Sequence, residues 1–118
     1  MNRRERLLVV EESAGTREIL ARYLDRIGYR ARLASSAPQA LVMLREGLET
    51  HAVVYDATSP ALSGSAFVQQ LRAEGNATPV LLMTKPFRLL DFGDRLLRLL
   101  ADHARSAISA SGHPSADR

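Results

Sequence analysis

Cysteine is absent from this chain of 118 residues. Without it, the protein forms neither disulfides nor thiolate metal sites. Long hydrophobic runs are also missing, because no apolar stretch approaches the length that spans a membrane. The N-terminal residues lead into only four apolar residues, at 7–10, which is too short for the apolar region of a signal peptide. These absences predict a cytoplasmic protein that makes no membrane contact.

Lysine is nearly absent as well. Fifteen of the sixteen basic residues are arginine, and the single lysine is Lys85. The formal net charge is +3, but the arginines are scattered along the predicted helices, without a tight cluster or interleaved aromatic residues. Nucleic-acid binding normally needs a basic patch on one face. The sequence therefore disfavours a nucleic-acid partner.

Apolar runs and helical repeats alternate along the chain. Short apolar or alternating runs predict β-strands at 7–10, 29–34, 52–55 and 80–83. Helical spacing of apolar residues predicts helices at about 19–27, 36–48, 65–74 and 89–103. Because helical crossovers join parallel strands, this order predicts an α/β fold with a doubly wound parallel sheet. We expect one domain over residues 1–104, followed by a small polar tail, 105–118, that is disordered.

The stretch from His51 to Gly64 carries the strongest chemical signal. It begins with a short apolar strand that runs directly into Asp56, and a dense set of loop-forming residues follows. A carboxylate at the carboxyl end of a buried strand lies where open α/β sheets keep their chemistry. The alternative is that Asp56 only caps a helix or stands in an exposed turn.

Three of the predicted strands end in polar residues. These residues are Glu11, Glu12, Asp56, Thr84 and Lys85. In a parallel sheet such strand ends share one edge, so the carboxylates, the hydroxyl and the ammonium should converge there. Clustered carboxylates favour a hard cation such as Mg²⁺, and a lysine beside a cation forms a site for a phosphoryl group. An aspartate at that place is a candidate nucleophile that forms an acyl phosphate.

At these positions the chain resembles the response-regulator receiver domain, which has a flavodoxin-like or CheY-like fold. The resemblance rests on three motifs, which are V-V-E-E at 9–12, D-A-T-S-P-A-L-S-G at 56–64 and P-V-L-L-M-T-K-P-F at 79–87. It implies that Asp56 is the phosphoacceptor, with Thr84 as the switch hydroxyl and Lys85 as the phosphate contact. It also implies that Glu11, Glu12, Asp56 and the backbone carbonyl of Thr58 hold Mg²⁺.

The chain departs from the receiver pattern at the acidic pair. The family usually has aspartate at one or both of the positions that Glu11 and Glu12 occupy. Glutamate is one methylene longer, and Mg²⁺ demands near-ideal octahedral geometry, so we expect this pair to weaken or displace the metal. The alternative is that the two glutamates are only charged residues at the end of a strand.

A second departure is larger. In the family, the switch threonine and the lysine lie on successive strands, but here Thr84 and Lys85 are adjacent. The fourth helix and fifth strand, a segment of roughly 20–25 residues, are apparently deleted. The sheet is then truncated to about four strands in the order 2-1-3-4, with a C-terminal helix. Adjacent residues of a strand point to opposite faces, so Thr84 and Lys85 cannot both reach Asp56 unless the chain bends at Pro86.

The deletion also exposes the strand at 80–83 as an apolar edge. Such an edge is prone to pair with another chain unless it is covered. We therefore hypothesise a homodimer, formed through this edge or by exchange of the last helix, or a last helix that folds over the edge.

Two functions remain open at this point. The first is a stand-alone receiver of a two-component phosphorelay, which accepts a phosphoryl group on Asp56 from a histidine kinase or phosphotransfer protein and signals to a downstream protein partner. The second is a degenerate receiver that serves as an interaction or dimerisation module without phosphorylation. We do not expect an enzyme. A flavodoxin-like enzyme would need a phosphate-binding loop after the first strand, and residues 13–16 follow two carboxylates that would repel a phosphate.

Overall fold

The computed structural model describes residues 5–58 and 61–112 and contains eight elements in strict alternation. They are β1 (Arg6–Val10), α1 (Ala14–Arg26), β2 (Arg30–Ala34), α2 (Ala37–Arg45), β3 (Ala52–Asp56), α3 (Gly64–Ala73), β4 (Val80–Met83) and α4 (Leu89–Gly112). Within this part of the chain, no helix is both long and apolar enough to cross a membrane.

The four strands form one parallel sheet in the order β2-β1-β3-β4. This confirms the predicted α/β fold and strand order. Leu8 in β1 pairs with Val53 in β3, and Val54 in β3 pairs with Leu81 in β4. Because neighbouring strands run in the same direction, their carboxyl ends lie together at one edge of the sheet.

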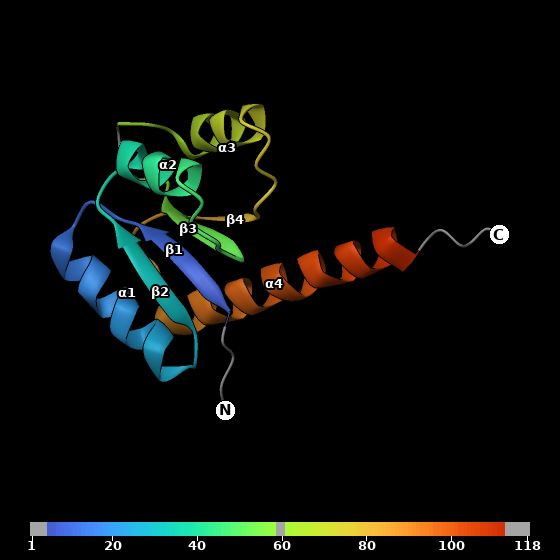
Figure 1. The fold of residues 1–118 in the computed structure, drawn as a ribbon. Helices are drawn as coiled ribbons and strands as arrows, with labels where there is room; N and C mark the ends of the chain where they lie inside the picture. The colour runs from blue at the N-terminus through green and yellow to red at the C-terminus, as the bar shows by residue number, and fades with distance from the viewer. Residues whose placement is uncertain (1–4, 59–60, 113–118) are drawn as a thin grey trace.

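Helices cover both faces of this sheet (Figure 1). On one face, Leu7, Val9 and Val54 pack with side chains of α1 and α4, including Leu20, Phe92 and Leu96. On the other face, Leu8, Val10 and Val53 pack with side chains of α2 and α3, including Leu41, Phe67 and Leu71. The continuous apolar runs in β1 and β3 follow from this arrangement, since strands buried on both faces need apolar residues at every position.

The helix boundaries have local causes. Ser13, Ser36 and Ser63 each precede a helix, and each side chain accepts a hydrogen bond from the backbone N–H three residues later. Gly28 follows α1 with a φ of 97°, a left-handed conformation that glycine adopts without strain.

The last helix is longer than the sequence pattern predicts. We expected it to end near His103 and to lead into a disordered tail from residue 105, but α4 continues to Gly112. The prediction was wrong for residues 105–112. Their small polar composition indicated disorder, yet alanine has the highest helix propensity, and extending an existing helix costs far less than starting one. Residues 113–118 lie outside the described part of the chain.

Candidate functional site

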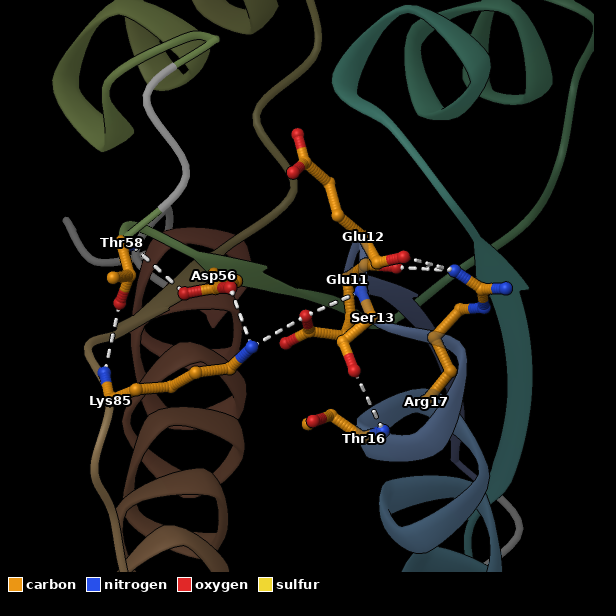
Figure 2. A network of polar contacts seen from close by, with 8 residues as sticks. All are labelled: Glu11, Glu12, Ser13, Thr16, Arg17, Asp56, Thr58 and Lys85. Atoms are coloured by element: carbon orange, nitrogen blue, oxygen red, sulfur yellow. Dashed lines mark hydrogen bonds and ion pairs between the residues drawn. The ribbon is translucent and has the colours of Figure 1, made fainter.

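The carboxyl ends of β1, β3 and β4 bring most of the predicted site residues together (Figure 2). Glu11 follows directly on β1, Asp56 is the last residue of β3, and Lys85 lies two residues beyond the end of β4. The backbone N–H of Ala57 donates to the Met83 carbonyl oxygen at 2.6 Å, which holds the end of β3 against β4. The convergence is therefore a product of the parallel sheet.

Lys85 reaches into this site despite the deletion. Its Nζ lies 2.8 Å from Glu11 Oε2 and 3.4 Å from Asp56 Oδ2. The hydrogen bond to Glu11 is the main cause of a raised pKa of Lys85, and the charges of both carboxylates add to the effect against desolvation. The single lysine of the chain thus connects the two carboxylates as a fixed positive charge.

The surroundings of Asp56 favour its ionised carboxylate form. The backbone N–H of Thr58 donates to Asp56 Oδ1 at 2.9 Å. The aspartate side chain thus bonds the backbone two residues later and forms a turn. Burial raises the pKa of Asp56, but hydrogen bonds from the Thr58 N–H and hydroxyl, together with the charge of Lys85, outweigh it. The pKa of this carboxyl is therefore below its usual value. Its side chain is 11% exposed, so one face remains open to a reactant.

The two glutamates of the acidic pair have different environments. Glu11 is 2% exposed, and its Oε2 accepts hydrogen bonds from the Ser13 N–H and from Lys85. Glu12 is exposed, and its side chain points away from Asp56 (Figure 2). Arg17 in α1 donates through Nη1 to the carbonyl oxygens of both glutamates, at 2.8 and 3.0 Å, and so fixes the backbone from which they extend.

The oxygen donors at this edge suit Mg²⁺ chemically, because Mg²⁺ prefers carboxylate and carbonyl oxygen. Glu11 and Asp56 already face one another across Lys85. In this conformation, however, the described residues contain no group of three acidic or histidine side chains placed to hold a metal ion. Glu12 would have to turn inward to complete the predicted set.

Thr84 does not join Glu11, Asp56 and Lys85 in the site. It is exposed and lines a different cavity, of about 430 Å³, together with residues of α4 such as Arg88 and Arg95. The strand ends at Met83, so the chain leaves the pleat there and Lys85 turns inward while Thr84 stays outside. The Lys85–Pro86 peptide bond is cis.

Two contributors were missed from the sequence. Thr58 accepts a hydrogen bond through Oγ1 from the Lys85 backbone N–H at 2.9 Å, and Arg17 holds the acidic pair. Thr58 was expected to act only through its backbone carbonyl. The position of Thr58, in a turn two residues after Asp56, could have indicated its contact with Lys85. Nothing in the sequence pattern distinguished Arg17 from the other helical arginines.

Comparison with known proteins places these features in a family. Residues 7–99 match the family model of the response regulator receiver domain. Probable transcriptional regulator ycf27 of Porphyra purpurea is 36% identical over 83 residues, which cover 70% of this chain and 33% of that protein. Response regulator MprA of Mycobacterium sp. (strain KMS) is 37% identical over 79 residues, which cover 67% and 34%. The chain therefore matches about a third of the length of these relatives.

Solved receiver structures share the fold. The receiver domain of the Francisella response regulator 1452 superposes with a TM-score of 0.74 at 18% identity, covering 84% of this chain and 98% of that one. Chemotaxis protein CheY4 of Vibrio cholerae gives a TM-score of 0.73 at 20% identity, covering 82% and 99%. Because the family match extends from β1 into α4 and is supported by this common fold, the chain belongs to the response regulator receiver domain family.

Proposed function

We propose that this chain is a phosphoacceptor of a two-component phosphorelay, with Asp56 as the residue that receives the phosphoryl group. The observation that carries the proposal is the geometry of Asp56, an ionised carboxylate at a strand end, with the ammonium of Lys85 3.4 Å away and the Thr58 N–H bound to its other oxygen. The donor would be a phosphohistidine of a histidine kinase or of a phosphotransfer protein.

In the transfer step, an oxygen of Asp56 attacks the phosphorus of the phosphohistidine. The new O–P bond forms as the N–P bond breaks, and the bonding electron pair remains on the imidazole nitrogen that leaves. Negative charge spreads over the phosphoryl oxygens during this step, and a fixed cation nearby stabilises it. Lys85 provides that cation, since its Nζ already contacts Asp56.

Glu11, Glu12, Asp56 and the Thr58 backbone carbonyl are the residues that would hold Mg²⁺ at this edge. When bound, Mg²⁺ neutralises charge on the phosphoryl oxygens. The rest of the chemistry belongs to the chain itself, in which Glu11 and Asp56 hold Lys85 in place and the Thr58 N–H holds Asp56 Oδ1.

The alternative function is a degenerate receiver that acts by contact alone. Two observations favour it: Lys85 bridges Glu11 and Asp56, and Glu12 points away from both (Figure 2). The receiver match, in contrast, extends over residues 7–99, and the sequence keeps Asp56 with loop-forming residues after it. We therefore favour the phosphoacceptor.

Acetyl phosphate with millimolar Mg²⁺ tests the phosphoacceptor directly. We expect the intact mass to increase by one phosphoryl group in the wild-type chain and not in Asp56→Asn, which keeps the size of the side chain but lacks the nucleophile. Asp91→Asn, on the exposed surface of α4, is the matched control and should be phosphorylated like the wild type. An unmodified wild-type chain that also shows no thermal shift with beryllofluoride would favour the degenerate receiver.

We further propose that the chain works without a catalytic output of its own and signals through protein contacts, one of which is a second copy. The Val53 N–H donates to the Pro79 carbonyl oxygen, and the Ala57 N–H donates to the Met83 carbonyl oxygen. Because backbone groups alternate in direction along a strand, the N–H and C=O groups of Val80 and Leu82 face away from β3. One of them, the Leu82 carbonyl, accepts a hydrogen bond from Arg95 at 3.1 Å.

Charge complementarity supports a second copy as the occupant of this edge. The cavity beside β4 is lined by both signs of charge, from Arg88 just before α4 and from Asp91, Asp94, Arg95 and Arg98 in α4. A twofold axis places such a surface against itself, and a surface with both signs is self-complementary, whereas an acidic or basic peptide would meet like charges. The oligomeric state in solution tests this contact.

A further inference from the structure

We propose that the Thr58 hydroxyl is a positioning group that couples Asp56 to the start of α4. It would take the part that the family resemblance assigns to Thr84. The coupling of phosphorylation to α4 rests on the proposed function, whereas the positioning of Lys85 by Thr58 does not.

Three contacts form a closed circuit around Asp56 (Figure 2). The Thr58 N–H donates to Asp56 Oδ1 at 2.9 Å, and Thr58 Oγ1 accepts from the Lys85 backbone N–H at 2.9 Å. The Lys85 side chain then returns to the site, with Nζ 3.4 Å from Asp56 Oδ2. Lys85 is thus attached twice, through its backbone to Thr58 and through its ammonium to Asp56, although the two residues of the backbone contact are 27 positions apart.

The contact between the Lys85 N–H and Thr58 Oγ1 lies just before α4, so a movement of the Lys85 backbone would reach this helix. Lys85 is followed closely by Phe87, whose ring lies 6.1 Å from that of Phe92 in α4. Phe92 is 2% exposed in the core. The segment from Lys85 to Leu89 is short, so a displacement of the Lys85 backbone is passed to the first turn of α4 with few intervening torsions.

The chemistry of a hydroxyl suits this place. Thr58 Oγ1 accepts from the Lys85 N–H and still has its own proton to donate, and Asp56 is the neighbouring acceptor. A phosphoryl group on Asp56 would bring stronger acceptors to that proton. Thr84 has no comparable place, because it is exposed and lines the cavity beside α4.

The unphosphorylated chain tests the positioning contact. Thr58→Val keeps the shape and the backbone groups but removes the hydroxyl. We expect hydrogen exchange of the Lys85 amide to become about two- to tenfold faster in this variant, the range for loss of one hydrogen bond. Thr58→Ser, which restores the hydroxyl, should exchange like the wild type, and so should Thr84→Val. Wild-type protection in Thr58→Val, or faster exchange in Thr84→Val, would overturn the assignment. Thermal melts of all three variants check that each is folded.

Beryllofluoride with Mg²⁺ tests the coupling. We expect it to change hydrogen exchange across residues 85–92 in the wild type and in Thr58→Ser, but not in Thr58→Val. A response in Thr58→Val equal to that of the wild type would overturn the coupling while leaving the proposed function intact. If the wild type does not bind beryllofluoride at all, both the proposed phosphoacceptor function and the coupling are rejected. The comparison of the unphosphorylated variants would still decide whether Thr58 positions Lys85.

Discussion

At the scale of the residue, Lys85 is the side chain on which the site depends. Its ammonium lies 2.8 Å from Oε2 of Glu11, a residue that is 2% exposed, and it also contacts Asp56. A buried carboxylate that loses its counter-charge is costly, because it has also lost its hydration. Lys85 therefore contributes to stability as well as to the proposed transfer.

Replacing Lys85 by methionine should expose this dependence. The variant removes the charge and keeps most of the apolar stem, so we expect unfolding free energy to fall by roughly 1–2 kcal/mol, the lower part of the range for charged hydrogen bonds, since Lys85 is partly solvated. Urea unfolding measures the change.

A double-mutant cycle separates this cost from general damage. Glu11→Gln removes the charge that Lys85 neutralises, so Lys85→Met should cost less in that background than in the wild type. Equal costs in both backgrounds would show that the ion pair does not contribute to stability.

At the scale of the element, α4 is placed by close packing on α1. A Cβ built on Gly93 of α4 would lie 2.5 Å from the Tyr23 hydroxyl oxygen and 3.4 Å from Tyr23 Cζ. Tyr23 in turn packs against Phe92, with ring centroids 6.1 Å apart. Gly93 thus costs helix propensity but allows the two helices to approach.

Gly93→Ala should therefore have opposite effects in two backgrounds. In the wild type the methyl group collides with the Tyr23 hydroxyl, and we expect a loss of about 1 kcal/mol or more. In Tyr23→Phe the hydroxyl is gone, and the same change should stabilise the fold by about 0.5–1 kcal/mol through helix propensity.

Gly15 in α1 provides the matched control, because no atom lies within 4 Å of a Cβ built there. Gly15→Ala should not destabilise the chain in either background. Thermal melts of the five variants measure these effects. If Gly93→Ala stabilises the wild type as much as it stabilises Tyr23→Phe, the close approach of α1 and α4 does not constrain residue 93.

At the scale of the whole molecule, the truncated sheet leaves β4 as an outer strand. The helices cover both faces of the sheet, but they do not pair with this edge as a further strand would (Figure 1). The α4 helix lies on the α1 face, and Arg95 reaches the edge only to bind the Leu82 carbonyl. Shortening a receiver by one strand thus leaves β4 at the edge of the sheet, where we propose that a second copy pairs.

A lysine at the edge should weaken the proposed dimer. We expect the wild type to dimerise at high concentration and Val80→Lys to weaken the dimer by about tenfold or more, because twofold pairing would bring the added charges together. Val42→Lys, on an exposed position of α2 away from the edge, is the matched control and should dimerise like the wild type. Sedimentation equilibrium measures the association. A wild type that remains a monomer at high concentration would exclude the edge contact.

The order of strands and helices, the strand order of the sheet and the meeting of Glu11, Asp56 and Lys85 at one edge were all predictable from the sequence. The element order follows from apolar periodicity and helical crossovers, and the meeting of the site residues follows from the rule that parallel strands end together. The order of strands within the sheet follows from the resemblance to the receiver family. Residues 105–112 were mispredicted because composition was weighed above the continuation of an existing helix.

Only the tertiary structure decided which hydroxyl approaches Asp56 and which glutamate faces it. Thr84 and Thr58 are both threonines beside strand ends, but Thr58 lies after β3 with its N–H bound to Asp56, whereas Thr84 lies after β4 and lines the cavity beside α4. Glu11 is buried against Lys85, while Glu12 points away, because Arg17 holds the backbone of the pair from another element. Such choices depend on contacts between residues far apart in the chain, and local sequence pattern does not encode them.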